Sequence, residues 1–135
     1  MAVQLSTTVR NARLDAIETA IGTSAVLKIR TGAPPANCGT ADSGTVLATM
    51  SLPSDWMAAA SSGSKAKSGT WEDASADAAG TAAHFRVYAS DGTTCHLQGT
   101  VTATGGGGDM TLDNVSIGAG QAVTITGFTL TDGNA

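Results

Sequence analysis

The residues best suited to chemistry are two histidines and two cysteines, three of them in one segment. His84, Cys95 and His96 lie between positions 82 and 104, and Cys38 lies far upstream. Zinc sites need three or four ligands at characteristic spacings, such as two cysteines separated by two residues, and no such spacing occurs here. The alternation around the histidines predicts that both point outward, from opposite faces of a hairpin. We therefore expect no metal site.

The two cysteines can form at most one disulfide, and their positions alone do not show whether they pair. The first residues have neither the basic segment nor the apolar stretch of a secretory signal, which indicates synthesis in a reducing cytoplasm. Cys95 has the strand parity of its apolar neighbours, where an unpaired cysteine packs as a small apolar side chain. We favour free thiols, with a Cys38–Cys95 disulfide as the alternative.

Three other features resemble functional motifs but lack their defining residues. Gly105–Gly108 is followed by neither the Lys-Ser/Thr pair nor the helix of a phosphate-binding loop. Asp109, Asp113 and Asn114 lack the spacing of an EF-hand and are explained as turn residues. No Gly-x-Ser-x-Gly or other ordered triad pattern occurs. We predict that the protein is not an enzyme and uses no cofactor.

The composition also argues against nucleic acid and membranes as partners. The 135 residues suffice for one domain, but only 13% are charged, against about 25% in an average protein. The net charge is −4 and no run of basic residues occurs, so we expect no direct contact with nucleic acid. No apolar stretch approaches the ~18 residues that cross a bilayer, so we expect no membrane association.

One helix and a series of short strands must position these residues. Leu5–Ile21 is the only convincing helix, because Ser6 or Thr7 can cap its start and Gly22 follows its last apolar residue. Its broad apolar stripe contains Val9, Leu14, Ile17, Ala20 and Ile21, and its opposite, polar face contains Asn11, Asp15 and Glu18. We expect the helix, residues 1–22, to pack on the remaining domain or to dock on a partner.

Residues 23–135 predict about seven to eight short strands with regular turns. This pattern favours a mainly β fold, an antiparallel two-sheet sandwich that is Ig-like or jelly-roll-like, with one N-terminal α-helix.

The clearest strands form a hairpin at 82–104. A three-residue turn, Ser90-Asp91-Gly92, with Gly92 left-handed, sets Val87 opposite Cys95 and Phe85 opposite Leu97 on a core face. The residues between them, His84, Arg86 and Tyr88, then point outward.

Several residues are candidates for contact with a partner. Arg10 and Arg13 fall within the apolar sector of the helix, so either their stems extend over it to water or they meet acidic groups of a neighbouring subunit. Trp56 is either a core anchor or an interface residue. The predicted partner-binding set is Arg10, Arg13, Leu14, Ile17, Pro34, Pro35, Trp56 and Met57.

The order of motifs resembles a known family. The segments TTVRNARLDAIETAIG, AVLKIRTGAPPA and GTVLATMSL are followed by GTAAHFRVYASDGTTCHLQGTV and DMTLDNVSIGAGQAVTITGFTLT. This order is similar to that of small structural proteins encoded in the virion-morphogenesis regions of tailed-bacteriophage genomes. The sequence departs from that pattern in its longer 57–69 segment and its four-glycine loop.

The resemblance implies a non-enzymatic virion structural protein, assembled in the host cytoplasm. It would be a capsid decoration or cement protein, or a neck or tail accessory subunit. The implied partners are repeated copies of a major capsid, neck or tail protein, together with further copies of the chain itself as a homo-oligomer. The alternative is a receptor- or carbohydrate-binding module of a tail fibre, a class that usually exposes aromatic side chains.

Overall fold

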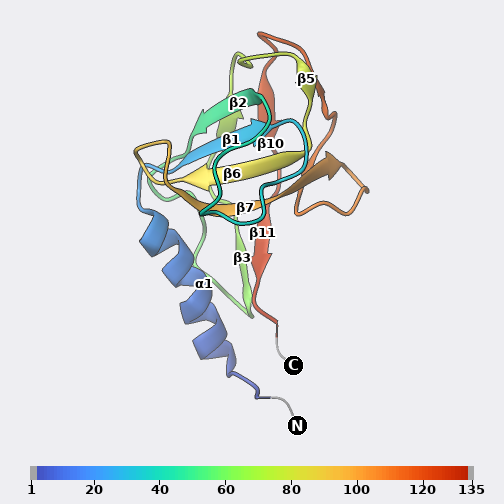
Figure 1. The fold of residues 1–135 in the computed structure, drawn as a ribbon. Coiled ribbons are helices and arrows are strands. Elements are labelled where there is room, and N and C mark those ends of the chain that lie inside the picture. Colours follow the sequence, from blue (N-terminus) through green and yellow to red (C-terminus); the bar gives the residue numbers. More distant parts are fainter. Residues whose placement is uncertain (1–2, 134–135) are drawn as a thin grey trace.

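The computed structural model describes residues 3–133, in which one helix is followed by eleven short strands (Figure 1). Positions 1–2 and 134–135, the ends of the two expected segments, lie outside the described residues. The elements are α1 (Thr7–Ile21), β1 (Val26–Arg30), β2 (Val46–Ser51), β3 (Ser64–Ala66), β4 (Trp71–Asp73), β5 (Gly80–Thr81), β6 (His84–Tyr88), β7 (Cys95–Ala103), β8 (Met110–Leu112), β9 (Ser116–Ile117), β10 (Val123–Ile125) and β11 (Thr129–Thr131).

The strands form one five-stranded sheet and three two-stranded ribbons. The sheet has the order β2-β1-β6-β7-β8, and the ribbons are β4–β10, β3–β11 and β5–β9. In Figure 1, β10 passes behind the sheet while β3 and β11 extend below it. The expected mainly β, sandwich-like fold with one N-terminal helix is confirmed. The expectation of a wholly antiparallel fold is wrong at one point, because β7 and β8 run parallel.

Aromatic rings connect the sheet to the β4–β10 ribbon and to the segment that leads into β11. Trp56 and Trp71 have ring centroids 5.9 Å apart, Trp71 and Phe128 5.7 Å, and Phe128 and Phe85 5.5 Å. All four side chains are buried, and tilted or edge-on contacts of this kind add to the free energy gained by burial. Trp56 is thus a core anchor.

The central hairpin forms, with a register two residues away from the predicted one. Val87 pairs with Leu97 and Phe85 pairs with Gly99, so the core face is as expected although the partners are not. The turn is longer than three residues because the Asp91 carboxylate accepts hydrogen bonds from the amides of Thr93 and Thr94, at 2.9 and 2.8 Å. Such a side-chain cap holds a turn that a parity argument cannot foresee.

A shift in register next to the turn moves Cys95 to the other face. Tyr88 pairs with Cys95 directly beside the Val87–Leu97 pair, so His96 is left in a bulge. Residues paired across antiparallel strands point to the same side of the sheet. Cys95 therefore shares the side of Tyr88, and the prediction that it packs on the core face is wrong.

Both faces of β6 are buried, which corrects the expectation of an outward face. His84, Arg86 and Tyr88 are 0%, 2% and 0% exposed. The segment between β1 and β2, residues 31–45, folds over them and covers this side of the sheet. Polar side chains can alternate along a strand and still be buried when a loop supplies their hydrogen-bond partners.

Helix α1 has the predicted ends, and it buries only part of its predicted apolar stripe, at Leu14 and Ile21. The Ser6 hydroxyl accepts a hydrogen bond from the Val9 amide at 3.3 Å, and Gly22, at φ 97°, donates its amide to Glu18 O at 2.9 Å. Part of the expected polar face also contacts the β domain, because Asn11 Oδ1 accepts from the amide of Gly63 at 2.9 Å.

The side chain of Lys65 fixes this orientation. Its Nζ is 2.7 Å from Asp15 Oδ1, 2.8 Å from Glu18 Oε2 and 2.9 Å from Ala58 O, and the residue is 2% exposed. A buried ammonium group must be compensated by anions and acceptors, so the helix has to turn its acidic side toward β3.

We predict that Lys65→Met loosens the helix, because it removes three hydrogen bonds at once. The free energy of unfolding in urea should fall by about 1–3 kcal/mol, and amide exchange in α1 should accelerate. Lys67→Met is the matched control, since Lys67 is half-buried and contacts Gly69 O and the Trp71 ring instead. Equal losses in the two variants would contradict the proposed attachment.

Candidate functional site

A cluster of charged side chains lies under the loop of residues 31–45. Asp42 Oδ1 accepts from Arg86 Nη1 at 2.6 Å and from the Tyr88 hydroxyl at 2.7 Å, and its Oδ2 accepts from Arg30 Nη2 at 2.9 Å. Partial burial opposes ionisation of Asp42, but these hydrogen bonds and the two guanidinium charges outweigh it and hold the pKa of the carboxyl below its usual range. Burial and the bond to Asp42 raise the pKa of Tyr88 to about 12.

Arg86 also holds the backbone of the loop. Its Nη2 donates to Asn37 O at 2.9 Å and to Thr40 O at 3.0 Å, while Gln98 Oε1 accepts from its Nε at 3.0 Å. Gln98 donates in turn to Pro35 O at 2.7 Å. These contacts connect the strand side chains to the backbone of residues 35–40, so the cluster acts as a clamp on the loop.

His84 lies at the edge of the same cluster. Its Nδ1 is 2.7 Å from Gly32 O, and its Nε2 is buried without a hydrogen-bond partner. Burial lowers the pKa of His84, and the charges of Arg30 and Arg86 lower it further, against the opposing effect of the Gly32 carbonyl. The ring is therefore neutral at pH 7 and carries its proton on Nδ1.

The outer surface of α1 is the first candidate for partner contact. Because Asn11, Asp15 and Glu18 face the domain, part of the apolar side of the helix faces away from it. Val9 is 44% exposed, and Ala16 and Ala20 are exposed on the same side of the helix. A shallow groove of about 290 Å³ runs beside them, lined by Arg13, Ala16, Ile17, Ala20, Ile21 and His96.

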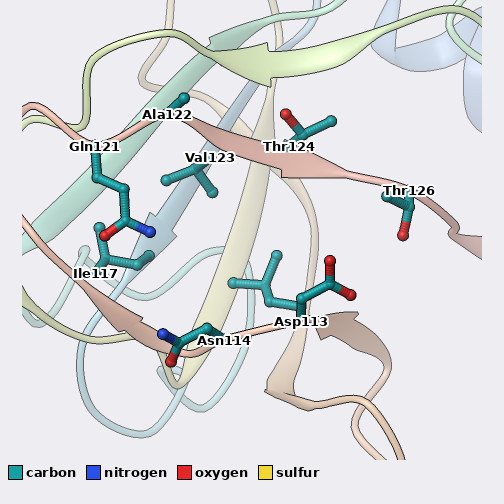
Figure 2. Close-up of a pocket in the computed structure, with 9 residues that line it drawn as sticks. Asp113, Asn114, Ile117, Gln121, Ala122, Val123, Thr124 and Thr126 are labelled. Carbon is teal, nitrogen blue, oxygen red and sulfur yellow. The ribbon is translucent and has the colours of Figure 1, made fainter.

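A slot between two strand edges is the second candidate. In the described residues, β8 pairs only with β7, and β10 pairs only with β4. The space between them measures about 270 Å³, and Figure 2 shows Val123 and Ile117 pointing into it from opposite sides. Asp113 and Asn114 lie along one rim and Gln121 lies on the other side, so polar side chains border the slot.

The structure divides the predicted partner-binding residues into three groups. Leu14, Trp56 and Met57 are buried within the chain, at 3%, 0% and 1% exposure, so they cannot belong to a contact surface and that part of the prediction is wrong. Ile17 lines the groove beside α1. Pro34 and Pro35 are half-buried in the clamped loop, away from the helix.

The two helix arginines both contact Asp132 of the same chain. Arg10 Nη1 donates to Asp132 O at 3.0 Å, and Arg13 Nε lies 3.3 Å from Asp132 Oδ2. The Arg13 side chain is still 60% exposed at the rim of the groove, so it remains available to a partner.

The described residues contain neither a metal-binding cluster nor a membrane-spanning helix. Among the described side chains, no group of three or more His, Cys, Asp or Glu residues is arranged to hold a metal ion. Within residues 3–133, no helix is both long enough and apolar enough to cross a membrane.

Comparisons of the chain with protein-family models, with curated proteins and with solved structures gave no match.

Sequence reasoning missed Asp42 and the slot for different reasons. Arg30 and Arg86 on the strands were a usable signal for a buried anion, because two such side chains next to each other require one. The slot arises from the placement of β8 and β10, which belong to different sheets, and no local pattern encodes that placement.

We predict that Asp42→Asn weakens the clamp, because two nearly buried guanidinium groups lose their counter-charge. The free energy of unfolding in urea should fall by about 2–4 kcal/mol, while Tyr88→Phe, which removes one hydrogen bond, should cost about 1 kcal/mol. Asp113→Asn, at the exposed rim of the slot, should leave stability unchanged. A loss of under about 0.5 kcal/mol for Asp42→Asn would show that the clamp contributes little.

Stability should also fall in mild acid because of His84. The pKa of His84 is lower in the folded chain than in the unfolded one, so the unfolded chain binds the proton first as pH drops below about 6.5. His84→Asn, which can keep a donor to Gly32 O, should remove this part of the dependence between pH 6.5 and 5. Urea unfolding at several pH values measures it, with the exposed His96→Asn as control. If His84→Asn kept the wild-type dependence of the free energy of unfolding on pH, another titrating group would be responsible for it.

Proposed function

We propose that the chain is a non-enzymatic structural subunit of a tailed-bacteriophage virion. It binds repeated copies of another virion protein, as a capsid decoration or cement protein or as a neck or tail accessory subunit. The order of its sequence motifs supports this assignment, as does a small sandwich-like β domain with an N-terminal helix beside it.

The orientation of α1 carries the proposal. Leu14 and Ile21 are buried, but the acidic side of the helix is turned toward Lys65. The rest of the apolar side, at Val9, Ala16 and Ala20, therefore faces outward. The exposed surface of Val9, Ala16 and Ala20 has side chains small enough for close approach of another helix or strand. Arg13 at its rim offers a charge-assisted hydrogen bond to an acidic partner.

The slot between β8 and β10 provides a second mode of attachment. An extended arm of a neighbouring subunit could add its backbone to either strand edge while an apolar side chain enters between Val123 and Ile117. Contacts of this size are weak individually, and repetition over a symmetric particle supplies the avidity that retains the subunit.

The burial of the aromatic side chains disfavours the alternative, a carbohydrate-binding module. The chain contains five aromatic residues, Trp56, Trp71, Phe85, Tyr88 and Phe128, and each is at most 6% exposed. Sugar-binding surfaces commonly stack exposed rings on the ligand, and the described surface offers none. Binding of the isolated chain to a glycan array would reverse this preference.

We predict that the wild-type chain is present in purified particles of a phage that encodes it. A copy number near that of the major capsid protein would indicate decoration, and about a dozen or fewer copies would indicate the neck or tail. Quantitative mass spectrometry of the particles measures both. Absence of the chain from infectious particles would overturn the proposal.

The helix surface can be tested in the same particles. The double variant Ala16→Glu, Ala20→Glu places two charges on the exposed apolar side at little cost in helix propensity. We expect it to lower incorporation at least tenfold, whereas Thr19→Glu, on the flank of the same helix, should incorporate normally. Normal incorporation of the double variant would transfer the contact from α1 to another surface, such as the slot.

A further inference from the structure

Cys38 and Cys95 are brought together by two features of the fold. The bulge at His96 turns Cys95 to the side of the sheet that carries Tyr88, and the loop of residues 31–45 covers that side. The backbone carbonyls of Asn37 and Thr40, on either side of Cys38, are both bound to Arg86 Nη2. Cys38 is thereby held above the β6–β7 pair, where Cys95 lies.

The two cysteines are neighbours across the loop and the sheet. Both cysteines are free and half-buried. Burial raises the pKa of the Cys95 thiol to about 12, and a hydrogen bond and charge interaction with Cys38 contribute to that rise. Because the thiolate is the reactive form, Cys95 is the slower nucleophile, and Cys38 is the thiol that reacts first with an external disulfide.

We propose that Cys38 and Cys95 are a disulfide-forming pair that fastens the loop of residues 31–45 onto the sheet when the protein meets a disulfide oxidant such as glutathione disulfide. The reduced loop is held only by hydrogen bonds and ion pairs, centred on Asp42 and Arg86. A covalent link adds to that clamp at a place where the loop already lies over the sheet.

The reaction is a thiol–disulfide exchange in two steps. The Cys38 thiolate attacks one sulfur of glutathione disulfide, forms a mixed disulfide and expels one glutathione thiolate. Cys95 then loses its proton to solvent and attacks the Cys38 sulfur, and the second glutathione thiolate leaves. The two protein thiols are oxidised, one glutathione disulfide is reduced to two glutathione molecules, and the protons lost by the cysteines are regained by glutathione.

The pair suits a protein that changes compartment, a consequence that depends on the virion role proposed above. A reducing cytoplasm would keep the loop thiols free during assembly, and an oxidising exterior would join them after release. Cross-links that close long segments restrict the unfolded chain most, so the oxidised form gains stability in the environment where it must last longest.

The test uses the isolated chain, equilibrated with glutathione disulfide at pH 8 and then alkylated. We expect intact mass and peptide mapping to show one intramolecular Cys38–Cys95 bond without a retained glutathione. The Tm should rise on the order of 10 °C and return to the starting value with dithiothreitol. Two alkylated thiols, glutathione on both cysteines, or disulfide-linked dimers would each overturn the proposal.

Single variants test the order of attack. Cys95→Ser should accumulate a glutathione adduct on Cys38 at least ten times faster than Cys38→Ser accumulates one on Cys95. Cys38→Ser should fold normally, because the loop is held through the backbone of Asn37 and Thr40. Since the isolated chain is assayed, a negative result leaves the virion role intact, and absence from virions would leave the disulfide intact.

Discussion

The ion pair between Arg86 and Asp42 is the interaction on which the arrangement of the sheet depends. Arg86 is in the middle strand of the sheet and is 2% exposed, so its charge is almost fully removed from water. Such a charge is tolerated only with a counter-ion and a nearly complete set of acceptors, which Asp42, Asn37, Thr40 and Gln98 supply. The loop of residues 31–45 must therefore remain closed for the sheet to be stable.

The same constraint operates at the helix. Lys65 brings the acidic side of α1 to β3, just as Arg86 brings Asp42 to β6. In both places a cation on a strand selects which side of another segment packs against it. Because Leu14 and Ile21 are buried as well, apolar burial and electrostatic compensation together decide which surface of α1 the protein presents.

The sequence was a good guide to local structure and a poor guide to the placement of charges. The helix caps at Ser6 and Gly22, the core face of the hairpin and the mainly β architecture follow from period and turn chemistry, which act over a few residues. The buried cations Arg86 and Lys65 were not foreseen as such, because polar alternation predicts an exposed face unless a distant segment covers it.

The candidate site was predicted only in part for the same reason. Ile17 and Arg13 do lie at the groove beside α1, whereas Trp56 and Met57 are core residues. Whether a large apolar side chain becomes a contact residue depends on which segments are left to cover it. The packing of the entire domain decides which side chains are covered, and this packing cannot be read from composition or from residue spacing.

The contact between Arg10 and Asp132 has a consequence for the order of folding during translation. The first turn of α1 is synthesised before every strand, yet its guanidinium is bonded to a carbonyl 122 residues later in the chain. Helix formation is local and fast, whereas a contact between residues so far apart in the sequence can form only after the later residue has been synthesised. A nascent chain therefore carries an incompletely fastened helix until its last strand has emerged, which couples the finished surface of α1 to completion of the domain.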